Sequence, residues 1–483
     1  MAPFSFFWHD YETFGIEPRR DRPSQFAGVR TDADLNEIEA PVMLYCQPAA
    51  DTLPTPEACL VTGITPQLCL AQGRSERHFA AAIEAELARP GTVGCGYNSL
   101  RFDDEVTRFM FWRCLMDPYA REWQNACGRW DLLDTVRCAW ALRPEGIVWP
   151  THPDGKPSFR LEDLARANGL AHEAAHDALS DVRATIALAR LVRQQQPRLW
   201  EHCLKLHRKQ AVIDEIGVGR PFVHLSGRYA TEGGCLAVVW PLAPHPRSKN
   251  ELIVWDLAHD PSELFTLNAA SIRERLFVAA AQLPAGQTRL PIKTLHLNKS
   301  PVVIANLKTL APAAERWRID LDQALRHAEI AMRQSHTMAG IWPEVYTRPQ
   351  SDAAPDVDED LYGGFLDNED RRALERLRAL PPQALAERRP AFHDARLDEL
   401  LLRFRARNHR ETLDEADAAR WQAHCRERWA GAVAWRERIA ELEASADARG
   451  REVLAALRAW APADAAPPAV GTTPGCGGAL PAA

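Results

Sequence analysis

The stretch that decides how this chain begins to fold is Phe4-Ser5-Phe6-Phe7-Trp8-His9-Asp10-Tyr11-Glu12-Thr13. Its apolar half is too short for a signal-peptide core and runs straight into charge, so it predicts a buried strand. Successive side chains of a strand point to opposite faces, so Asp10 and Glu12 share a face while Tyr11 points away. Paired carboxylates at the end of an apolar strand are costly unless a cation lies between them. The stretch therefore predicts a metal site, with a strand end that merely reaches solvent as the alternative.

A second acidic position follows a later strand. The segment Gly96-Tyr97-Asn98-Ser99-Leu100-Arg101-Phe102-Asp103-Asp104 reads as the end of a strand over 92–97, a polar turn and the start of a helix near 105–115. Asp103 is the ligand that we predict here. The alternative is that an acid in this first helical turn only stabilises the helix dipole, a role that Asp104 also fits.

A third position opens a strong amphipathic helix predicted over 177–194. Asp177 is the predicted N-cap, Asp181 lies one turn into the helix, and His176 precedes the cap. The histidine can therefore hang over the face on which Asp181 points. His172 is an alternative a few residues upstream. Small Ala178 beside the acid favours His176.

Neither spacing is specific by itself. D-x-E recurs at Asp103/Glu105 and Asp367/Glu369, and H-x4-D recurs at His172/Asp177, His393/Asp398 and His409/Asp414. The order of the pieces along the chain carries the argument.

Composition indicates a soluble protein of about three domains, because 483 residues exceed what one core organises. No apolar run approaches the roughly 18 residues that cross a bilayer, so we expect no membrane association and a cytoplasmic location. The eleven cysteines include no C-x-x-C pair and indicate neither a disulfide framework nor a zinc site. Carboxylate ligands favour Mg²⁺ or Mn²⁺. The net charge of −7 argues against nonspecific coating of nucleic acid but leaves room for a local basic groove.

The pattern changes along the chain. Residues 1–195 read as α/β, with a helix also predicted over 130–142, and residues 197–350 read as short β-rich runs separated by Gly and Pro. An acidic linker over 351–360 leads into an all-helical part over 354–460, and the Ala/Pro/Gly-rich tail 461–483 is predicted to be disordered.

Taken together, these motifs resemble the DEDDh group of 3′→5′ exonucleases, and more narrowly the bacterial exodeoxyribonuclease I family. The similar phrases include HDYETFG, DRPSQFAGVRTD, VTGITPQ, GYNSLRFDDEVTR, RWDLLD, ALRPEG, PSFRLEDL, LNKSP, LYGGF and RFRARN, which together span roughly residues 5–460. The resemblance implies an RNase H-like α/β exonuclease domain, then an SH3-like β-rich domain, then an all-helical C-terminal domain. It also implies stepwise release of 5′-mononucleotides from the 3′ end of single-stranded DNA, in DNA repair and recombination.

The resemblance assigns roles to individual positions. Asp10, Glu12, Asp103 and Asp181 are expected to hold two Mg²⁺ ions, or Mn²⁺, with His176 as general base; Glu12 is also expected to touch substrate. Further expected substrate contacts are Arg108, Tyr119, Trp123, Arg137 and Arg160. Their types suit phosphate binding and base stacking. Core packing of the two aromatics and local ion pairs for Arg108 and Arg137 are the alternatives.

The family also binds the acidic C-terminal tail of single-stranded DNA-binding protein. The positions expected to do so here are Arg143, Arg220 and Arg316. We expect a monomer. The rival hypotheses are an exonuclease of this group that acts mainly on RNA, and a catalytically silent clamp on single-stranded DNA.

Overall fold

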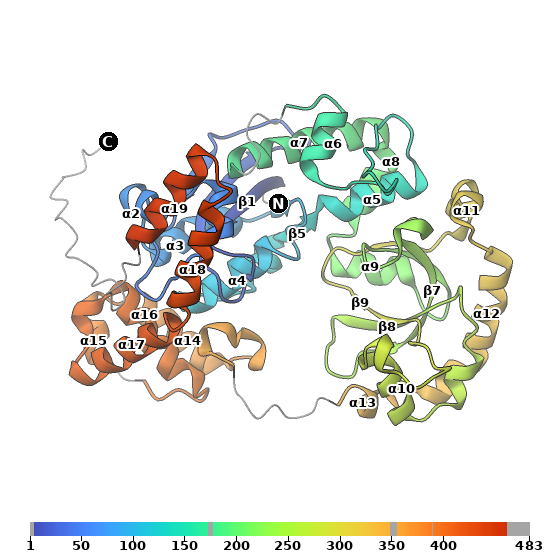
Figure 1. Ribbon diagram of the computed structural model, residues 1–483. Coiled ribbons are helices and arrows are strands. Elements are labelled where there is room, and N and C mark those ends of the chain that lie inside the picture. The colour runs from blue at the N-terminus through green and yellow to red at the C-terminus, as the bar shows by residue number, and fades with distance from the viewer. Residues whose placement is uncertain (1–3, 172–176, 348–354, 389, 461–483) are drawn as a thin grey trace.

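The computed structural model describes residues 4–171, 177–347, 355–388 and 390–460, which form three units (Figure 1). The N-terminal unit is a five-stranded sheet of order β3-β2-β1-β4-β5 with helices around it. Its elements are β1 Ser5–Thr13, β2 Pro23–Thr31, β3 Val42–Tyr45, α1 Pro56–Thr62, α2 Pro66–Gln72, α3 Glu76–Leu87, β4 Thr92–Gly96, α4 Asp103–Arg113, η1 Ala120–Glu122, η2 Gln124–Ala126, β5 Gly128–Asp131, α5 Leu132–Leu142, α6 Leu161–Ala167 and α7 Ala178–Gln195.

Strand β1 lies at the centre of this sheet. It pairs antiparallel with β2 from Phe6 to Thr13 and parallel with β4 only from Ser5 to Trp8. Its apolar residues are buried because both faces are covered, which explains why they read as a continuous apolar run. Phe6 and Trp8 pack into the core that also holds α5 and α7, whereas Phe7 packs into the core against α3 and α4.

The helix predicted over residues 130–142 is wrong at its start. Trp130 and Asp131 belong to β5, which pairs parallel with β4, and the helix α5 begins at Leu132. The side chain of Asp131 caps this helix by accepting from the Leu133 amide at 2.9 Å. A short buried strand followed at once by a helix leaves no turn signal between them, so the helical periodicity was extended backwards.

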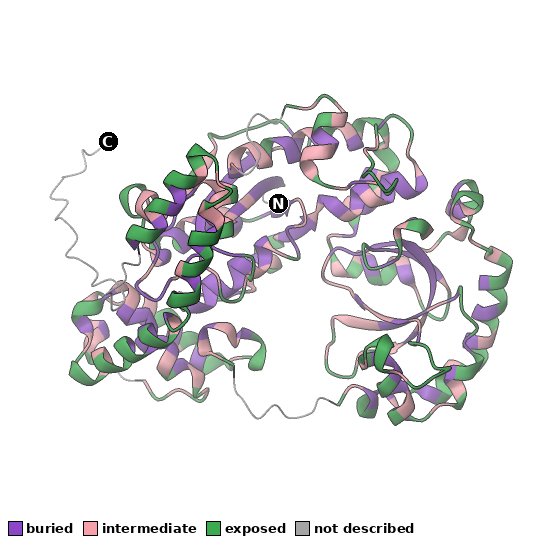
Figure 2. Ribbon diagram, viewed as in Figure 1, coloured by how far each residue is buried: buried purple, intermediate pink, exposed green. Residues whose placement is uncertain are grey.

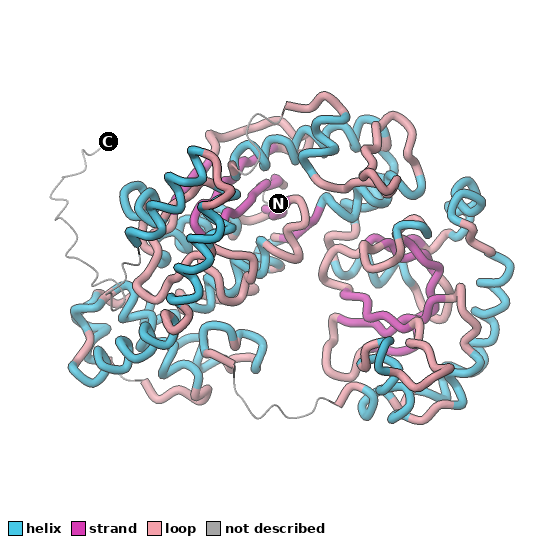
Figure 3. The backbone as a smooth tube through the Cα atoms, viewed as in Figure 1, coloured by secondary structure: helices cyan, strands magenta, loops and turns pink. Residues whose placement is uncertain are grey.

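The middle unit is an antiparallel five-stranded sheet of order β10-β6-β7-β8-β9 flanked by helices (Figure 3). Strand β10 was not predicted, because three residues give no period to recognise. The elements from α8 onward are α8 Pro197–Lys205, α9 Lys209–Ile216, β6 Phe222–Leu225, η3 Thr231–Gly233, β7 Leu236–Pro244, β8 Glu251–Asp256, η4 Ser262–Thr266, α10 Ala269–Phe277, η5 Ala280–Gln282, β9 Ile292–His296, β10 Val302–Ile304, η6 Leu307–Leu310, α11 Ala311–Trp317, α12 Leu321–Gln334, η7 Ser335–Met338 and α13 Trp342–Val345.

The C-terminal unit is helical throughout its described residues, as predicted. Its elements are η8 Val357–Glu359, η9 Leu361–Gly363, α14 Asn368–Arg378, α15 Pro382–Glu387, α16 Arg396–Asn408, η10 Arg410–Thr412, α17 Glu415–Arg428, α18 Ala432–Glu443 and α19 Ala448–Trp460. Figure 1 shows α18 and α19 lying against the N-terminal unit beside α2. None of the helices within the described ranges is long and apolar enough to cross a membrane.

The C-terminal unit is bound to the N-terminal one through a row of tryptophans. The indole N–H groups of Trp429, Trp435 and Trp460 donate to the carbonyls of Ala50, Pro54 and Thr52, at 2.9, 2.5 and 3.3 Å. These rings join a buried cluster that also contains Phe14, the residue just after β1. The surface between these two units is therefore core-like, and Figure 2 shows buried residues on both sides of it.

Candidate active site

Three carboxylates meet at the end of β1. Asp10 and Glu12 are half-buried and flank the buried Tyr11, which packs against Phe26, so they share the face that the strand alternation predicts. Oxygens of Asp10, Glu12 and Asp181 lie within 4.8 Å of one another. Oxygen ligands at this spacing fit a hard divalent cation such as Mg²⁺.

Asp103 is held at the same place by the backbone of β1. Strand β4 leaves β1 after the Trp8–Cys95 pair, so the Tyr11 amide lies beyond the ladder on that side. It donates instead to Asp103 Oδ1 at 3.0 Å. A buried amide needs a partner, and here the partner is the carboxylate that opens α4. This hydrogen bond places Asp103 beside Asp10 and Glu12, the residues on either side of Tyr11.

Burial and mutual repulsion make this group electrostatically strained. Burial raises the pKa of Glu12 to about 8, and the charges of Asp181 and Asp103 add to the shift. Burial likewise raises the pKa of Asp103 to about 8, and burial followed by repulsion from Asp103 and Glu12 raises the pKa of Asp10 well above its usual range. A bound divalent cation removes this repulsion, so the donor set fits a metal ion.

Asp104 has a different environment from its neighbour. Its carboxylate accepts from Arg121 Nη2 at 2.6 Å and from Arg129 Nη1 at 2.8 Å. Burial opposes its ionisation, but these guanidiniums outweigh burial and hold the pKa of Asp104 far below its usual range. Asp104 is already neutralised by protein cations and is not arranged to hold a metal.

The start of α7 is tied to the sheet beside Glu12. Asp177 caps the helix as predicted, accepting from the Ser180 amide at 3.1 Å. The Ala178 amide donates to Oε1 of Gln25, which pairs with Glu12 across the β1–β2 ladder, at 3.4 Å. The predicted general base His176 and its alternative His172 lie outside the described residues.

Asp131 positions the turn that leads to Asp103, a role that sequence reasoning missed. Its oxygens accept from the amides of Asn98 at 2.9 Å and Leu100 at 3.2 Å, and Asn98 adopts the left-handed φ of 62° that asparagine tolerates. The signal is a carboxylate at the end of an apolar stretch of strand, the same signal that singles out Asp10. The helical periodicity of residues 130–142 hides this strand in the sequence.

The structure divides the predicted substrate residues into an exposed and a buried set. Trp123 is 66% exposed, and the Arg160 side chain is 63% exposed while it pairs with Glu162 at 2.5 Å. Arg108 is buried between Glu105 and Glu122, with its guanidinium over the half-buried ring of Tyr119. Arg137 pairs with Asp134 at 2.6 Å.

Two of the three predicted partner residues lie at the end of α5. Arg143 follows the helix directly, and Arg316 donates to the Trp140 carbonyl at 3.2 Å with its guanidinium 4.2 Å from the Trp317 ring centroid. Arg220 lies elsewhere, donating to the last carbonyls of α9.

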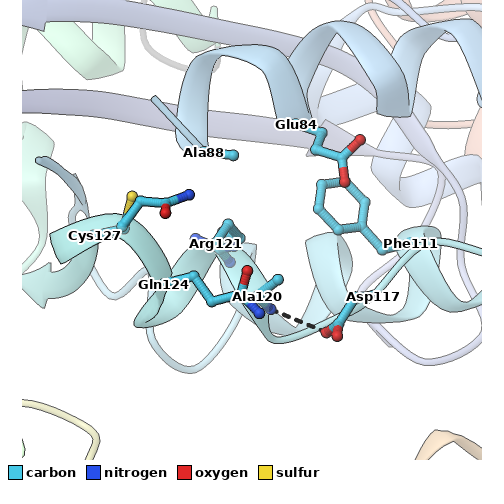
Figure 4. A pocket seen from close by; sticks show the side chains of 9 residues that line it. Glu84, Ala88, Phe111, Asp117, Ala120, Arg121, Gln124 and Cys127 are labelled. Carbon is cyan, nitrogen blue, oxygen red and sulfur yellow. Dashed lines mark hydrogen bonds between the residues drawn. The ribbon is translucent and has the colours of Figure 1, made fainter. Parts of the chain in front are cut away.

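A small cavity lies behind Arg121, away from the carboxylates. Figure 4 shows its lining, including Glu84, Asp117, Gln124 and Arg121, and its volume is about 30 Å³. This volume suits one or two water molecules and excludes a nucleotide. This cavity is therefore not a nucleotide site.

A second group of possible ligands lies between the N- and C-terminal units. Asp51, Asp358 and His424 approach one another in the buried interior. Arg22 lies 3.1 Å from both carboxylates, and Arg407 lies 2.7 Å from Asp51 and also contacts Asp358. Burial opposes ionisation, but the two guanidiniums outweigh it and hold the pKa of both carboxyls well below the usual range. Two protein cations already occupy the place that a metal would take.

Comparison with family models covers almost the whole chain. Residues 7–189 match the family described as Exonuclease, residues 207–348 the Exonuclease I SH3-like domain, and residues 355–463 the Exonuclease I C-terminal domain. Exodeoxyribonuclease I of Haemophilus influenzae is 43% identical over 429 residues, covering 88% of this chain and 90% of that protein. The chain belongs to the exodeoxyribonuclease I family. Exodeoxyribonuclease I of Escherichia coli is 44% identical over 430 residues, covering 88% of this chain and 89% of that protein.

Solved exonuclease I structures share the whole architecture. The moderately thermophilic exonuclease I from Methylocaldum szegediense is 48% identical, with a TM-score of 0.89, and covers 95% of this chain and 98% of its own. The E. coli exonuclease I complex with a dA16 oligonucleotide is 41% identical, with the same TM-score and coverage of 95% and 99%. The zinc-bound E. coli complex with single-stranded DNA has a TM-score of 0.88 at 40% identity, with coverage of 95% and 99%. The predicted order of RNase H-like, SH3-like and helical domains is confirmed, as is the predicted enzyme class, an exodeoxyribonuclease.

Proposed function

We propose that this chain degrades single-stranded DNA from its 3′ end and releases 5′-mononucleotides by hydrolysis with two divalent cations, Mg²⁺ or Mn²⁺. The observation that carries the proposal is the meeting of Asp10, Glu12 and Asp181 within 4.8 Å, with Asp103 tied to the Tyr11 amide between the first two. Membership of the exodeoxyribonuclease I family supports it, as do the relatives that were crystallised with oligonucleotides.

The four carboxylates have distinct places in this mechanism. Asp10, which lies among the other three carboxylates, would be the ligand shared by the two cations. Glu12, Asp103 and Asp181 would complete the two sites, and Glu12 would also border the nucleotide. When bound, the cations supply neutralisation of the phosphate charge and an acidified water. The hydrogen bond from the Tyr11 amide fixes the position of Asp103, which would be one of their ligands.

We assign the proton transfer to His176. An imidazole with an ordinary pKa of about 6.5 can take a proton from the attacking water near neutral pH. His172 provides a matched control four residues away on the same segment. Changing His176 to Ala should lower the cleavage rate by about 10²–10⁴-fold, the usual contribution of a general base. Changing His172 to Ala should leave the rate within a few-fold, and the opposite pattern would reassign the base.

The substrate contacts in this proposal begin with the exposed side chains. Trp123 can meet a base as it stands, and Arg160 is exposed enough to meet a phosphate, although it also pairs with Glu162 at 2.5 Å. Tyr119 supports the guanidinium of Arg108. For Arg108 and Arg137 to bind phosphate, they would exchange their present acid partners for the strand.

The remaining assignments follow from the family. We propose a monomer in the cytoplasm that acts in DNA repair and recombination, with domains over 1–195, 197–350 and 354–460 and a tail over 461–483. We also propose that Arg143, Arg316 and Arg220 bind the acidic tail of single-stranded DNA-binding protein. A tail peptide should bind more weakly when each arginine is changed to Ala, and unaltered affinity would remove that residue from the site.

One experiment tests the central proposal. The full chain is incubated with end-labelled single-stranded DNA, duplex DNA and RNA, with Mg²⁺ or with EDTA, beside an Asp10→Ala variant. Mononucleotides released only with Mg²⁺, from the 3′ end of single-stranded DNA and not by the variant, are the expected result. Preferential cleavage of RNA, or binding without cleavage, would replace the proposal with one of its rivals. Cleavage by Asp10→Ala within a few-fold of the parent would overturn the mechanism.

A further inference from the structure

One carboxylate next to the site receives a contact from each of the three domains. Glu105 lies in the first turn of α4, two residues beyond Asp103. Its Oε1 accepts from Arg108 of the same helix at 2.8 Å and lies 3.5 Å from Lys299 Nζ of the SH3-like domain. Its Oε2 accepts from the Tyr362 hydroxyl of the C-terminal domain at 2.5 Å. The two oxygens of one side chain thus join domains that are otherwise far apart in the sequence.

The partners of Glu105 are themselves held in place. The Tyr362 hydroxyl also accepts from Arg108 Nη1 at 3.0 Å, so it is satisfied as donor and as acceptor, and its ring packs edge-on against Phe109. The loop that carries Lys299 is fixed on the exonuclease domain, where Asn298 and Ser300 on either side both bond to Arg129. Because each partner is fixed in its own domain, its contact with Glu105 links that domain to α4.

Glu105, Lys299 and Tyr362 are partly covered, but solvent still reaches them. The Glu105 side chain is 15% exposed, the Lys299 side chain is 33% exposed, and Tyr362 is 45% exposed. A hydrogen bond to a charged group under such partial cover contributes only modestly and can be remade. Contacts of this strength can break and re-form while the buried tryptophan cluster keeps the N- and C-terminal domains together.

We propose that Glu105 is an interdomain latch, which fastens the SH3-like and C-terminal domains to α4 so that a strand reaching across the domains is retained between successive cleavages. The proposal rests on the proposed function, because it concerns the hold on single-stranded DNA. Glu105 is a positioning residue. Residues i and i+2 of a helix point in widely different directions, so it faces away from the carboxylates that Asp103 joins.

The variants that test the latch each change one side chain of the Glu105 group, and both Glu105 and Tyr362 also contact Arg108. Tyr362→Phe removes the hydroxyl and keeps the ring against Phe109. Lys299→Met removes the ammonium and keeps the stem. Glu105→Gln removes the charge that both partners share. Lys308→Met, an exposed lysine in the same domain as Lys299, is the matched control.

Two substrates separate holding from chemistry. A long 5′-labelled single-stranded DNA, challenged with excess unlabelled DNA after binding, measures the nucleotides removed per encounter. A trinucleotide, which gives the domains far less chain to hold, measures the hydrolysis rate. We expect roughly a tenfold fall in nucleotides per encounter for Glu105→Gln and a smaller fall for the other two variants, in line with the loss of hydrogen bonds to a charged group. The trinucleotide rate should stay within twofold of the parent, and Lys308→Met should match the parent in both measurements.

The outcomes are distinguishable. If the parent cleaves neither substrate, the proposed function fails, not the latch alone. If the parent is active but Glu105→Gln and Tyr362→Phe keep its number of nucleotides per encounter, or lose trinucleotide rate equally, the latch is overturned. The double variant Glu105→Gln/Tyr362→Phe should lose less than the sum of the two single losses, because the two residues share one contact; fully additive losses would also count against the latch. If Glu105→Gln does not fold, Tyr362→Phe and Lys299→Met decide the question.

Discussion

Asp103 and Asp104 are consecutive residues whose carboxylates are stabilised in opposite protonation states. Asp103 accepts from the Tyr11 amide beside the other site acids, and burial raises its pKa to about 8. Asp104 is enclosed by Arg121 and Arg129, whose charges outweigh its burial and lower its pKa. One residue of helix rotation therefore separates a group that needs a cation from a group that already has two.

Exchanging each carboxylate for an amide should separate these roles. Asp104→Asn leaves two buried guanidiniums without their anion and should lower the free energy of unfolding by about 3–5 kcal/mol. Asp103→Asn relieves repulsion and should not destabilise the metal-free protein, but it should lower the cleavage rate by at least about 100-fold. Urea denaturation in EDTA and single-turnover cleavage check both. Equal destabilisation by the two changes would contradict the assignment.

The stability of the metal-free protein should fall as the pH rises. The pKa of Glu12 and that of Asp103 stand at about 8 in the folded state, against ordinary values of 4.5 and 3.8. The folded protein therefore holds protons that the unfolded chain has lost, and their contribution to stability disappears between about pH 4 and pH 8. Thermal melts in EDTA from pH 6 to 9 should show this decline, and Glu12→Gln should show less of it. Mg²⁺ should flatten the curve, whereas a parent melting temperature that rises with pH in EDTA would disprove the assignment.

Arg160 should contribute to binding through a phosphate. Arg160→Gln should raise KM for single-stranded DNA with little change in kcat and should reduce the salt dependence of binding by about one ion. Arg166→Gln is the control, because its side chain lies on α6 just after Arg160 and is 77% exposed. Binding titrations from 50 to 200 mM salt check the prediction. Parallel salt dependences for the parent and Arg160→Gln would remove this contact.

Trp123 should contribute through base stacking. Trp123 is 66% exposed and contributes little to core packing. Trp123→Ala should therefore weaken binding of single-stranded DNA by about tenfold and leave the melting temperature unchanged. Phe277→Ala is the control, since that ring is 58% exposed on the SH3-like domain. Fluorescence anisotropy with a labelled oligonucleotide measures both. Equal affinities of the two variants for single-stranded DNA would show that Trp123 does not stack on a base.

The sequence predicts the parts of the fold whose pattern is local. The strand alternation of Asp10 and Glu12 and the N-cap at Asp177 appear in the structure as predicted. Trp130 and Asp131 were assigned to the wrong element, because a short strand that continues directly into a helix has no period of its own. Helices α1 and α2, of seven residues each, were also missed, and the helices α8 to α13 of the middle unit had no predicted bounds.

Contacts between distant segments could not be predicted at all. Nothing in the local pattern around Glu105 indicates that Lys299 and Tyr362 meet it, because such pairing depends on how whole domains pack. The same limit applies to Arg108, for which a phosphate contact and local acid partners were both open; the structure shows the acid partners. The ligand and base roles of the site residues stay predictions until the variants above are measured.

The tryptophan row between the first and last parts of the chain has a consequence for synthesis. The carbonyls of Ala50, Thr52 and Pro54 receive their indole partners from residues 429, 460 and 435. About 400 residues separate the two sides, so at 5–20 residues per second the ribosome needs roughly 20–80 s to supply those partners. A nascent chain that already contains every predicted catalytic carboxylate still lacks the cover over Phe14, the residue just after β1. The domain that leaves the ribosome first is thus the last to be completed.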